Sequence, residues 1–180
     1  MGETETLSPA IPADVEEMAA TVLREACDID VRLATAESCT GGLLASLLTD
    51  VDGVAHAFER GFVTYSEAAK NELLGVPRSL IERDGAVSKP VAVAMAEGAL
   101  HASDAAVALA ITGFAGKGGP DDEAGLVHLA CAGTGQPTAH REEHFGDIGR
   151  GPVRIAALRV ALEMIATALD ARIAPAAKHG

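Results

Sequence analysis

The chain has 180 residues, of which 48% are hydrophobic but only 3% aromatic, and its formal net charge is -12. This length predicts one domain that buries roughly two-thirds of the unfolded surface. With so few aromatic residues, the core must consist of Ala, Val, Leu and Ile, whose small side chains suit a layered α/β fold. The negative charge argues against nucleic acid or an anionic membrane as partner, because both would repel the chain. The composition instead favours a protein whose ligand or substrate is a small molecule.

The cysteines and the hydropathy pattern narrow the class further. Cys27, Cys39 and Cys131 form no CxxC spacing and are odd in number, which is typical neither of a disulfide framework nor of a zinc site. The sequence holds no run of about 18 apolar residues, and its acidic start lacks the basic residues of a signal peptide. We therefore expect a cytoplasmic protein.

The first part of the chain predicts a tail, a helix, a strand and a second helix. Residues 1–13 are mostly polar and contain two prolines, so we expect a mobile N-terminal tail. Apolar residues spaced i, i+3, i+4 and i+7 predict a helix that follows, with Asp14 as its N-cap. A buried strand is predicted over 31–35 and a helix over 40–49.

The rest of the chain continues the alternation and then places two strands in succession. Strands are predicted at 61–65, 104–112, 126–132 and 140–145, and helices at 66–74, from Ser88 onward, and at 152–172, with a glycine-rich loop at 113–120. This order predicts a three-layer α/β/α single domain, residues 14–173, around a mixed, mostly parallel sheet. Residues 174–180 are expected to form a C-terminal tail.

Residues 36–42, Ala-Glu-Ser-Cys-Thr-Gly-Gly, lie at a predicted strand-to-helix corner. Such a corner presents free backbone N–H groups, which favour an anion. Ser38 stands where a nucleophilic hydroxyl would be accessible, and the N–H groups of Thr40, Gly41 or Gly42 could stabilise an oxyanion. Two alternatives remain open at this stage: Ser38 and Thr40 as helix caps, and the neighbouring Cys39 thiol as the nucleophile.

A serine nucleophile needs a base, and the six histidines occupy no recognisable catalytic corner. Tyr65, at the end of a predicted strand, and Lys70, five residues later in a predicted helix, are better candidates. Partial burial lowers the pKa of a lysine and makes its neutral amine available. A Ser–Lys or Ser–Tyr–Lys arrangement would support acyl transfer. The plainer alternatives are that Tyr65 packs and that Lys70 is a solvated charge.

Two further polar groups belong to other element ends. Thr112 and Gly113 end a predicted strand, and such loops gather at one edge of an open α/β sheet, where ligands bind. Arg150 and Arg154 lie four residues apart on one helical face, and paired guanidinium groups suit a phosphate or carboxylate. They could equally form ion pairs with neighbouring carboxylates.

Taken together, these segments resemble the C-terminal domain family of the competence/damage-inducible protein CinA, which also occurs alone as nicotinamide mononucleotide deamidase. The resemblance runs in unbroken order over about residues 15–170. Its motifs are Ala-Glu-Ser-Cys-Thr-Gly-Gly at 36–42, Gly-Phe-Val-Thr-Tyr-Ser at 61–66 with Lys70, Leu-Gly-Val at 74–76, Gly-Ala-Val-Ser at 85–88, Met-Ala-Glu-Gly-Ala at 95–99 and Ile-Thr-Gly-Phe-Ala-Gly at 111–116.

The resemblance implies hydrolysis of the carboxamide of nicotinamide mononucleotide to nicotinic acid mononucleotide and ammonia, in bacterial pyridine nucleotide salvage, with no metal or other cofactor. It implies Ser38 as nucleophile, with Tyr65 and Lys70 as proton-handling partners. The substrate-binding set that goes with these roles is Glu37, Thr40, Gly41, Gly42, Thr112, Gly113 and Arg150 or Arg154, the two arginines being candidates for the 5′-phosphate. We also expect self-association, since several helices are rich in alanine.

The second half of the chain departs from the family pattern. Lys117 stands where the family usually has proline, and residues 122–125, Asp-Glu-Ala-Gly, keep only the glycine of the usual Lys-Pro-x-Gly. Ile148 and Gly149 are inserted before Arg150. Two alternatives to the deamidase follow from these departures: a non-catalytic nucleotide-binding or regulatory domain, and an amidase with another carboxamide substrate.

Overall fold

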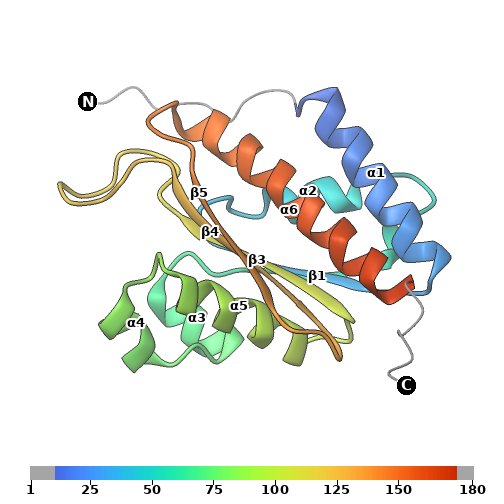
Figure 1. Ribbon diagram of the computed structural model, residues 1–180, viewed down its shortest axis with the longest axis horizontal. Helices are drawn as coiled ribbons and strands as arrows, with labels where there is room; N and C mark the ends of the chain where they lie inside the picture. The colour runs from blue at the N-terminus through green and yellow to red at the C-terminus, as the bar shows by residue number, and fades with distance from the viewer. Residues whose placement is uncertain (1–10, 174–180) are drawn as a thin grey trace, which may run out of the picture.

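The computed structural model describes residues 11–173, so the predictions for residues 1–10 and 174–180 lie outside the described part of the chain. Its centre is a five-stranded sheet of order β2-β1-β3-β4-β5 (Figure 1). The strands are β1 (Leu33–Glu37), β2 (Phe58–Val63), β3 (Val107–Gly113), β4 (Leu126–Gly133) and β5 (Ala139–His144).

The sheet is mixed, as predicted. β1 pairs in parallel with both β2 and β3, whereas β4 runs antiparallel to β3 and β5 antiparallel to β4. Four strands therefore point the same way and only β4 opposes them. The carboxyl ends of β1, β2 and β3 consequently lie at one edge of the sheet, which is where open α/β sheets bind ligands.

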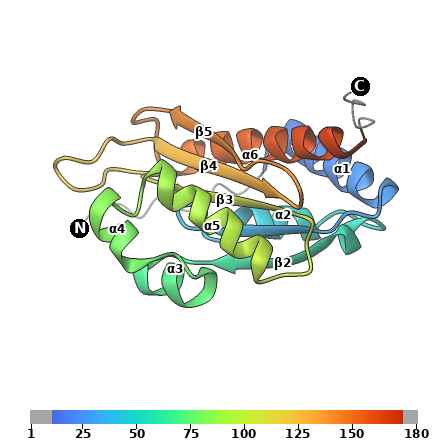
Figure 2. The same ribbon diagram turned by 60° about the horizontal axis from the view of Figure 1, so that its bottom comes forward.

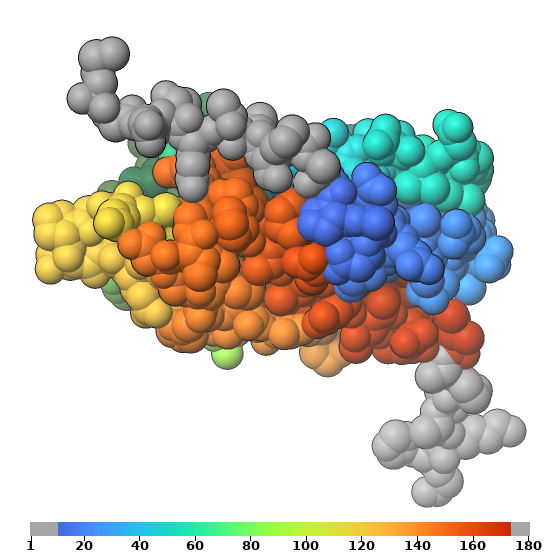
Figure 3. All heavy atoms as spheres, turned by 90° about the horizontal axis from the view of Figure 1, so that it is seen from above, coloured from blue at the N-terminus to red at the C-terminus, as the bar shows by residue number. Residues whose placement is uncertain are grey.

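Helices cover both faces of the sheet, which confirms the three layers (Figures 1 and 2). One face carries the N-terminal, second and C-terminal helices, α1 (Ala13–Asp28), α2 (Leu43–Thr49) and α6 (Arg150–Ile173). The space-filling view looks onto α1 and α6 (Figure 3). The other face carries α3 (Glu67–Leu74), α4 (Arg78–Asp84) and α5 (Lys89–His101). Within residues 11–173, no helix is both long and apolar enough to cross a membrane.

Small side chains bring α5 close to the sheet and to α3. The sheet residues that face α5 are alanines: Ala34, Ala36, Ala108, Ala110, Ala130 and Ala132. On the helix itself, a Cβ at Gly98 would collide with the backbone carbonyl oxygen of Leu74, the last residue of α3. Glycine therefore permits this close approach, and the approach fixes α3 beside the end of β1.

Several predicted boundaries were wrong, and two of the differences move candidate site residues. β1 ends at Glu37 rather than at residue 35, so Glu37 belongs to the strand. β2 covers Phe58–Val63 rather than 61–65, so Tyr65 lies in the connection that follows. The first helix begins at Ala13 with Pro12 as N-cap, because the Asp14 carboxylate binds Arg159 of α6 instead of capping.

Two short elements escaped prediction, the helix α4 and a 3-10 helix at Ala55–Ala57. α4 has seven residues and no side-chain cap at its N-terminus. A segment this short shows little periodicity in a sequence, and its helical state depends on packing.

Candidate active site

Ser38 and Lys70 form a buried pair at the carboxyl edge of the sheet. Ser38 is the first residue after β1, and its N–H donates to the Ile111 carbonyl of β3 at 2.9 Å, which fixes the corner. Lys70 lies in α3 and is 1% exposed. Its Nζ lies 2.9 Å from Ser38 Oγ and 2.7 Å from the carbonyl oxygen of Thr64. The structure thus brings together two residues that are 32 positions apart in the chain.

The position of Lys70 follows from how α3 begins and ends. The Ser66 hydroxyl caps the helix by accepting from the Ala69 N–H at 3.1 Å, as predicted. Gly75 ends it in the left-handed region, with φ of 67°, also as predicted. Before the helix, the Thr64 N–H donates to the Glu37 carbonyl at 2.8 Å, so the chain stays beside β1 until it turns toward α3.

Burial lowers the pKa of the Lys70 ammonium, although the neighbouring Glu67 carboxylate acts in the opposite direction. Among the described residues, no carboxylate forms an ion pair with Lys70, which leaves the charged form without the partner that would stabilise it. A neutral amine can donate one N–H to the Thr64 carbonyl and accept the O–H of Ser38. The site therefore suits proton abstraction from a hydroxyl.

The Glu37 side chain, predicted to bind substrate, accepts hydrogen bonds from the backbone of the corner. Its side chain is fully buried, and its two carboxylate oxygens accept from the backbone N–H groups of Gly42, Leu44 and Ala45 at 3.2, 3.1 and 2.8 Å. A carboxylate at the start of α2 satisfies donors that the helix itself leaves unpaired. Glu37 therefore holds the corner in shape, and its oxygens are occupied.

The same contacts reduce the choice of oxyanion donors. The Gly42 N–H is bound to Glu37, and the Gly41 N–H donates to the Ser38 carbonyl at 3.1 Å. Of the predicted donors, only the N–H of Thr40 has no acceptor within residues 11–173, and the N–H of Cys39 is equally free there. Gly41 and Gly42 contribute conformation instead, with φ of 65° and 94°.

Two buried hydroxyls beside Ser38 have no hydrogen-bond partner in the described part of the chain. They belong to Thr40, two residues after Ser38, and Thr64, whose backbone pairs with the end of β1. The third such hydroxyl, that of Thr35, lies inside the sheet, near Gly61. Burying an unpaired hydroxyl is costly, so unpaired groups around a nucleophile are consistent with a ligand that completes their hydrogen bonds.

Both predicted arginines reach this edge from the start of α6. The Arg154 Nε donates to the Cys39 carbonyl at 2.8 Å. Arg150 lies against the glycine-rich loop, where a Cβ at Gly116 would be 3.1 Å from Arg150 Nη2. The Asp147 carboxylate, three residues before Arg150, forms an ion pair with Lys117 at 3.5 Å. The two arginines therefore bring positive charge to the edge that holds Ser38.

Two other predicted site residues, Tyr65 and Thr112, form no hydrogen bond with the Ser38 side chain in the described part of the chain. Tyr65 is 71% exposed and makes no hydrogen bond to Ser38 or Lys70 among the described residues. The Thr112 hydroxyl is buried and donates to the Ala86 carbonyl at 2.8 Å, and Gly113 is needed because a Cβ there would meet the Leu126 carbonyl oxygen at 2.7 Å. The Thr112 hydroxyl is thus engaged by the Ala86 carbonyl, and Gly113 permits the close approach of β4 to β3.

The alternative nucleophile, Cys39, does not suit the task. Burial raises the pKa of its thiol to about 12, so the thiol stays protonated at neutral pH.

The sequence did not predict that the Thr64 carbonyl is the second hydrogen-bond partner of Lys70. Every residue carries a carbonyl, and no sequence signal distinguishes the one that points to a lysine.

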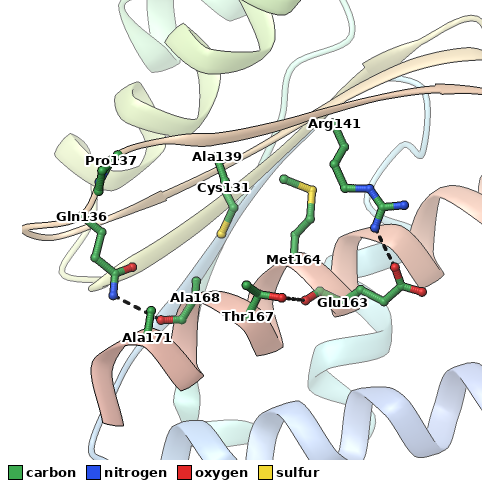
Figure 4. Close-up of a pocket in the computed structure, with 10 residues that line it drawn as sticks. All are labelled: Cys131, Gln136, Pro137, Ala139, Arg141, Glu163, Met164, Thr167, Ala168 and Ala171. Atoms are coloured by element: carbon green, nitrogen blue, oxygen red, sulfur yellow. Dashed lines mark hydrogen bonds and ion pairs between the residues drawn. The ribbon is translucent and has the colours of Figure 1, made fainter. Parts of the chain in front are cut away.

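A separate hollow of about 360 Å³ lies on the face of the sheet that carries α6, between this helix, β4 and β5 (Figure 4). Its wall is largely apolar, with Cys131 and Met164 pointing into it. The polar groups at its rim bind one another, for example Arg141 Nη1 and Glu163 Oε2 at 2.6 Å. None of the predicted site residues lines it.

Comparison with known proteins agrees with this architecture. The family model of the CinA C-terminal domain matches residues 15–169 of this chain. A CinA-like protein of Akkermansia muciniphila is 55% identical over 111 residues, which are 61% of this chain and 27% of that protein. A CinA-like protein of an Anaeromyxobacter species is 45% identical over 156 residues, 86% of this chain and 38% of that protein. The chain thus spans well under half the length of these curated relatives.

Solved structures cover the chain more completely. The competence/damage inducible protein of Agrobacterium tumefaciens superposes with a TM-score of 0.85 at 43% identity, over 91% of this chain and 99% of that one. The competence damage-inducible protein A of Klebsiella pneumoniae gives a TM-score of 0.81 at 35% identity, over 87% of this chain and 97% of that one. From the sequence match and the shared fold together, the chain belongs to the CinA C-terminal domain family.

Proposed function

We propose that the chain is an amidohydrolase that converts nicotinamide mononucleotide to nicotinic acid mononucleotide and ammonia. The observation that carries the proposal is the 2.9 Å contact between Lys70 Nζ and Ser38 Oγ in a buried site. An alcohol next to a desolvated amine is a nucleophile with its base, which is what amide hydrolysis by acyl transfer requires.

The reaction follows from this pair in two halves. The neutral Lys70 amine takes the Ser38 proton as Oγ attacks the carboxamide carbon, forming a tetrahedral oxyanion. Lys70 then returns that proton to the amide nitrogen, the C–N bond breaks, ammonia leaves, and an ester remains on Ser38. In the second half, Lys70 takes a proton from water, hydroxide attacks the ester, and the proton returns to Ser38 as the acid leaves.

The charges around the site support an anionic substrate. The protein is acidic overall, with a net charge of -12, yet Arg150 and Arg154 both reach the edge that holds Ser38. Positive groups gathered at one place in an acidic protein attract an anion to that place. We assign the 5′-phosphate of the mononucleotide to this edge, with Arg150, against Gly116, as its main ligand.

Tyr65 keeps a place in the proposal as a residue that could contact bound substrate. Tyr65 is the second residue after β2, its side chain is 71% exposed, and it lies outside the buried pair. We propose further that the enzyme acts in the cytoplasm, in pyridine nucleotide salvage, and that it self-associates.

The altered loop is the observation that favours the second candidates, a nucleotide-binding domain without activity or an amidase for another carboxamide. Within the loop, the Asp122 carboxylate accepts from the Gly119 N–H at 2.6 Å and so closes a turn. Its charge is thus engaged by the loop itself, while Lys117 supplies a cation nearby, paired with Asp147. This arrangement is compatible with an anionic ligand, which is why deamidation ranks first.

The test is ammonia release from a panel that contains nicotinamide mononucleotide, nicotinamide riboside, free nicotinamide and simple aliphatic amides. We expect turnover of the mononucleotide by the wild type and by Ser46→Ala, a matched control because Ser46 is an exposed serine of the neighbouring helix. Turnover should vanish in Ser38→Ala. Binding of the mononucleotide without ammonia release would instead support the non-catalytic domain, and turnover of another amide alone would support the second amidase.

A further inference from the structure

The peptide unit between Cys39 and Thr40 is held on one side and free on the other. Its carbonyl oxygen, that of Cys39, accepts from Arg154 Nε at 2.8 Å. Its N–H, that of Thr40, has no acceptor within residues 11–173. The unit begins one residue after the nucleophile, so its free N–H lies in the turn that carries Ser38.

The helix that follows does not supply this donor. Glu37 binds the N–H groups of Gly42, Leu44 and Ala45, so the donors at the start of α2 are already occupied by the protein's own carboxylate. The free donors belong to the turn before the helix, at Cys39 and Thr40. The Thr40 side chain, 2% exposed, adds a hydroxyl that also lacks a partner among the described residues. Three unused polar groups therefore accumulate on two consecutive residues beside a paired nucleophile.

We infer that Arg154 is a positioning residue that orients and polarises the Cys39–Thr40 peptide as the oxyanion donor of the reaction. The inference rests on the proposed function. A peptide unit is planar and its C=O and N–H share one conjugated system, so a guanidinium on the oxygen fixes the plane and makes the N–H a stronger donor. Pre-oriented donors of this kind stabilise a tetrahedral oxyanion strongly because no reorganisation is needed during the reaction.

This role differs from phosphate binding in what it predicts for kinetics. A phosphate ligand acts on the ground state and the transition state alike, so its loss raises KM for a phosphorylated substrate. An oxyanion donor acts on the transition state, so its loss lowers kcat whether or not the substrate carries a phosphate. We therefore assign different roles to the two arginines. Arg150, against Gly116, binds the phosphate, and Arg154, bound to the Cys39 carbonyl, orients the oxyanion donor.

The experiment compares Arg154→Gln and Arg154→Lys with wild type on nicotinamide mononucleotide and on nicotinamide riboside, which lacks the phosphate. Arg159→Gln is the matched control, since Arg159 belongs to the same helix but binds Asp14 at the surface. We expect Arg154→Gln to lower kcat by about 10- to 100-fold on both substrates, somewhat less than the loss of a whole oxyanion donor. KM should stay within about twofold and Arg154→Lys should recover part of kcat. A rise in KM for the mononucleotide alone, with kcat unchanged, would overturn the inference.

A second readout does not depend on the amide substrate. A small phosphonofluoridate reacts with activated serines by forming an O–P bond to the serine and releasing fluoride. Its phosphoryl oxygen gains negative charge in the transition state at the place where the oxyanion would form, and intact-mass measurement reports the adduct. We expect rapid labelling of Ser38 in the wild type and in Arg159→Gln, and labelling about 10-fold slower or more in Arg154→Gln. Equal rates in folded Arg154→Gln and wild type would refute the role of Arg154.

The two readouts also separate this inference from the proposed function. Slow labelling of Arg154→Gln, together with no wild-type turnover of the mononucleotide, would support Arg154 but reject the proposed substrate. A wild type that neither labels nor turns over any amide would reject both, because the Ser38 hydroxyl would then not be nucleophilic. Thermal unfolding of each variant establishes that the compared proteins are folded.

Discussion

The corner that carries Ser38 and the loop between β3 and β4 lie at the same edge of the sheet but are built in opposite ways. At the corner, the chain from Glu37 to Ala45 is fixed by buried hydrogen bonds to a carboxylate, a lysine and an arginine. The loop after Gly113 instead protrudes from one end of the molecule (Figures 1 and 3), and residues 117–123 are exposed. The groups proposed to make and break bonds thus stand on buried backbone, and the departures from the family pattern at residues 117 and 122–124 lie in a protruding loop.

The largest effect should come from removing the nucleophile. Ser38→Ala deletes the atom that forms the ester and should reduce kcat for ammonia release by about 10⁴-fold or more, with a thermal midpoint close to that of the wild type. A steady-state ammonia assay together with thermal unfolding measures both quantities. A variant that retains more than a tenth of wild-type turnover would show that the corner does not carry the chemistry.

Replacing the base should separate activity from stability. Lys70→Met keeps the length of the side chain and removes the amine, so we expect kcat to fall by about 10³-fold or more. Burial disfavours the charged amine, so the variant should unfold within a few degrees of the wild type at neutral pH. Lys89→Met, a change at an exposed lysine, is the control. A Lys70→Met protein that is active and folded would contradict the assignment of the base.

The corner should depend on Glu37 for its shape rather than for binding. Glu37→Ala leaves three backbone N–H groups without their acceptor and should lower the free energy of unfolding by about 2–4 kcal/mol. Glu37→Gln keeps one acceptor oxygen and should lose less. Chemical denaturation measures both, and Glu82→Ala, at an exposed glutamate of α4, is the control. If Glu37→Ala left the free energy of unfolding unchanged but raised KM, Glu37 would instead be a substrate-binding residue.

The pH dependence should follow the neutral amine of Lys70. Its lowered pKa means that the amine loses its proton at a lower pH than an ordinary lysine with a pKa of about 10.4. kcat/KM should therefore rise with pH and level off below that value. Stability follows the same sign: between the lowered and the ordinary pKa the unfolded chain binds more protons, so the free energy of unfolding increases with pH there. If the rise of kcat/KM with pH were unchanged in Lys70→Met, the rise would have to be assigned to another titrating group.

The smallest effect is expected in the exposed loop. Lys117→Ala removes a solvent-exposed ion pair with Asp147, which contributes no more than about 1 kcal/mol to stability. We expect kcat within about threefold of wild type and a modest rise in KM for the mononucleotide but not for the riboside. A loss of kcat as large as that of Lys70→Met would mean that the loop belongs to the rigid part of the site.

The same contrast explains what could be predicted from the sequence. Periodicity and turn residues were sufficient for the three layers and for α3 between Ser66 and Gly75. They left the pairing of Ser38 with Lys70 open beside plainer alternatives, and the family resemblance favoured it. The sequence patterns could not predict which backbone N–H and carbonyl groups the buried side chains of the site bind. Which N–H groups Glu37 occupies, and which carbonyl Arg154 binds, depends on the path of the turn and not on residue type. The exposure of Tyr65 likewise depended on where β2 ends, a boundary that packing decides.

The measurement that tests the central claim most directly is the capture of the ester on Ser38. A reaction with nicotinamide mononucleotide is stopped with acid during turnover, and the protein is digested. The mass of the peptide that contains Ser38 is then measured by mass spectrometry. The account predicts a fraction of that peptide heavier by the substrate minus ammonia, absent from Ser38→Ala. Ammonia released at the wild-type rate by Ser38→Ala, with no adduct in the wild type, would contradict it.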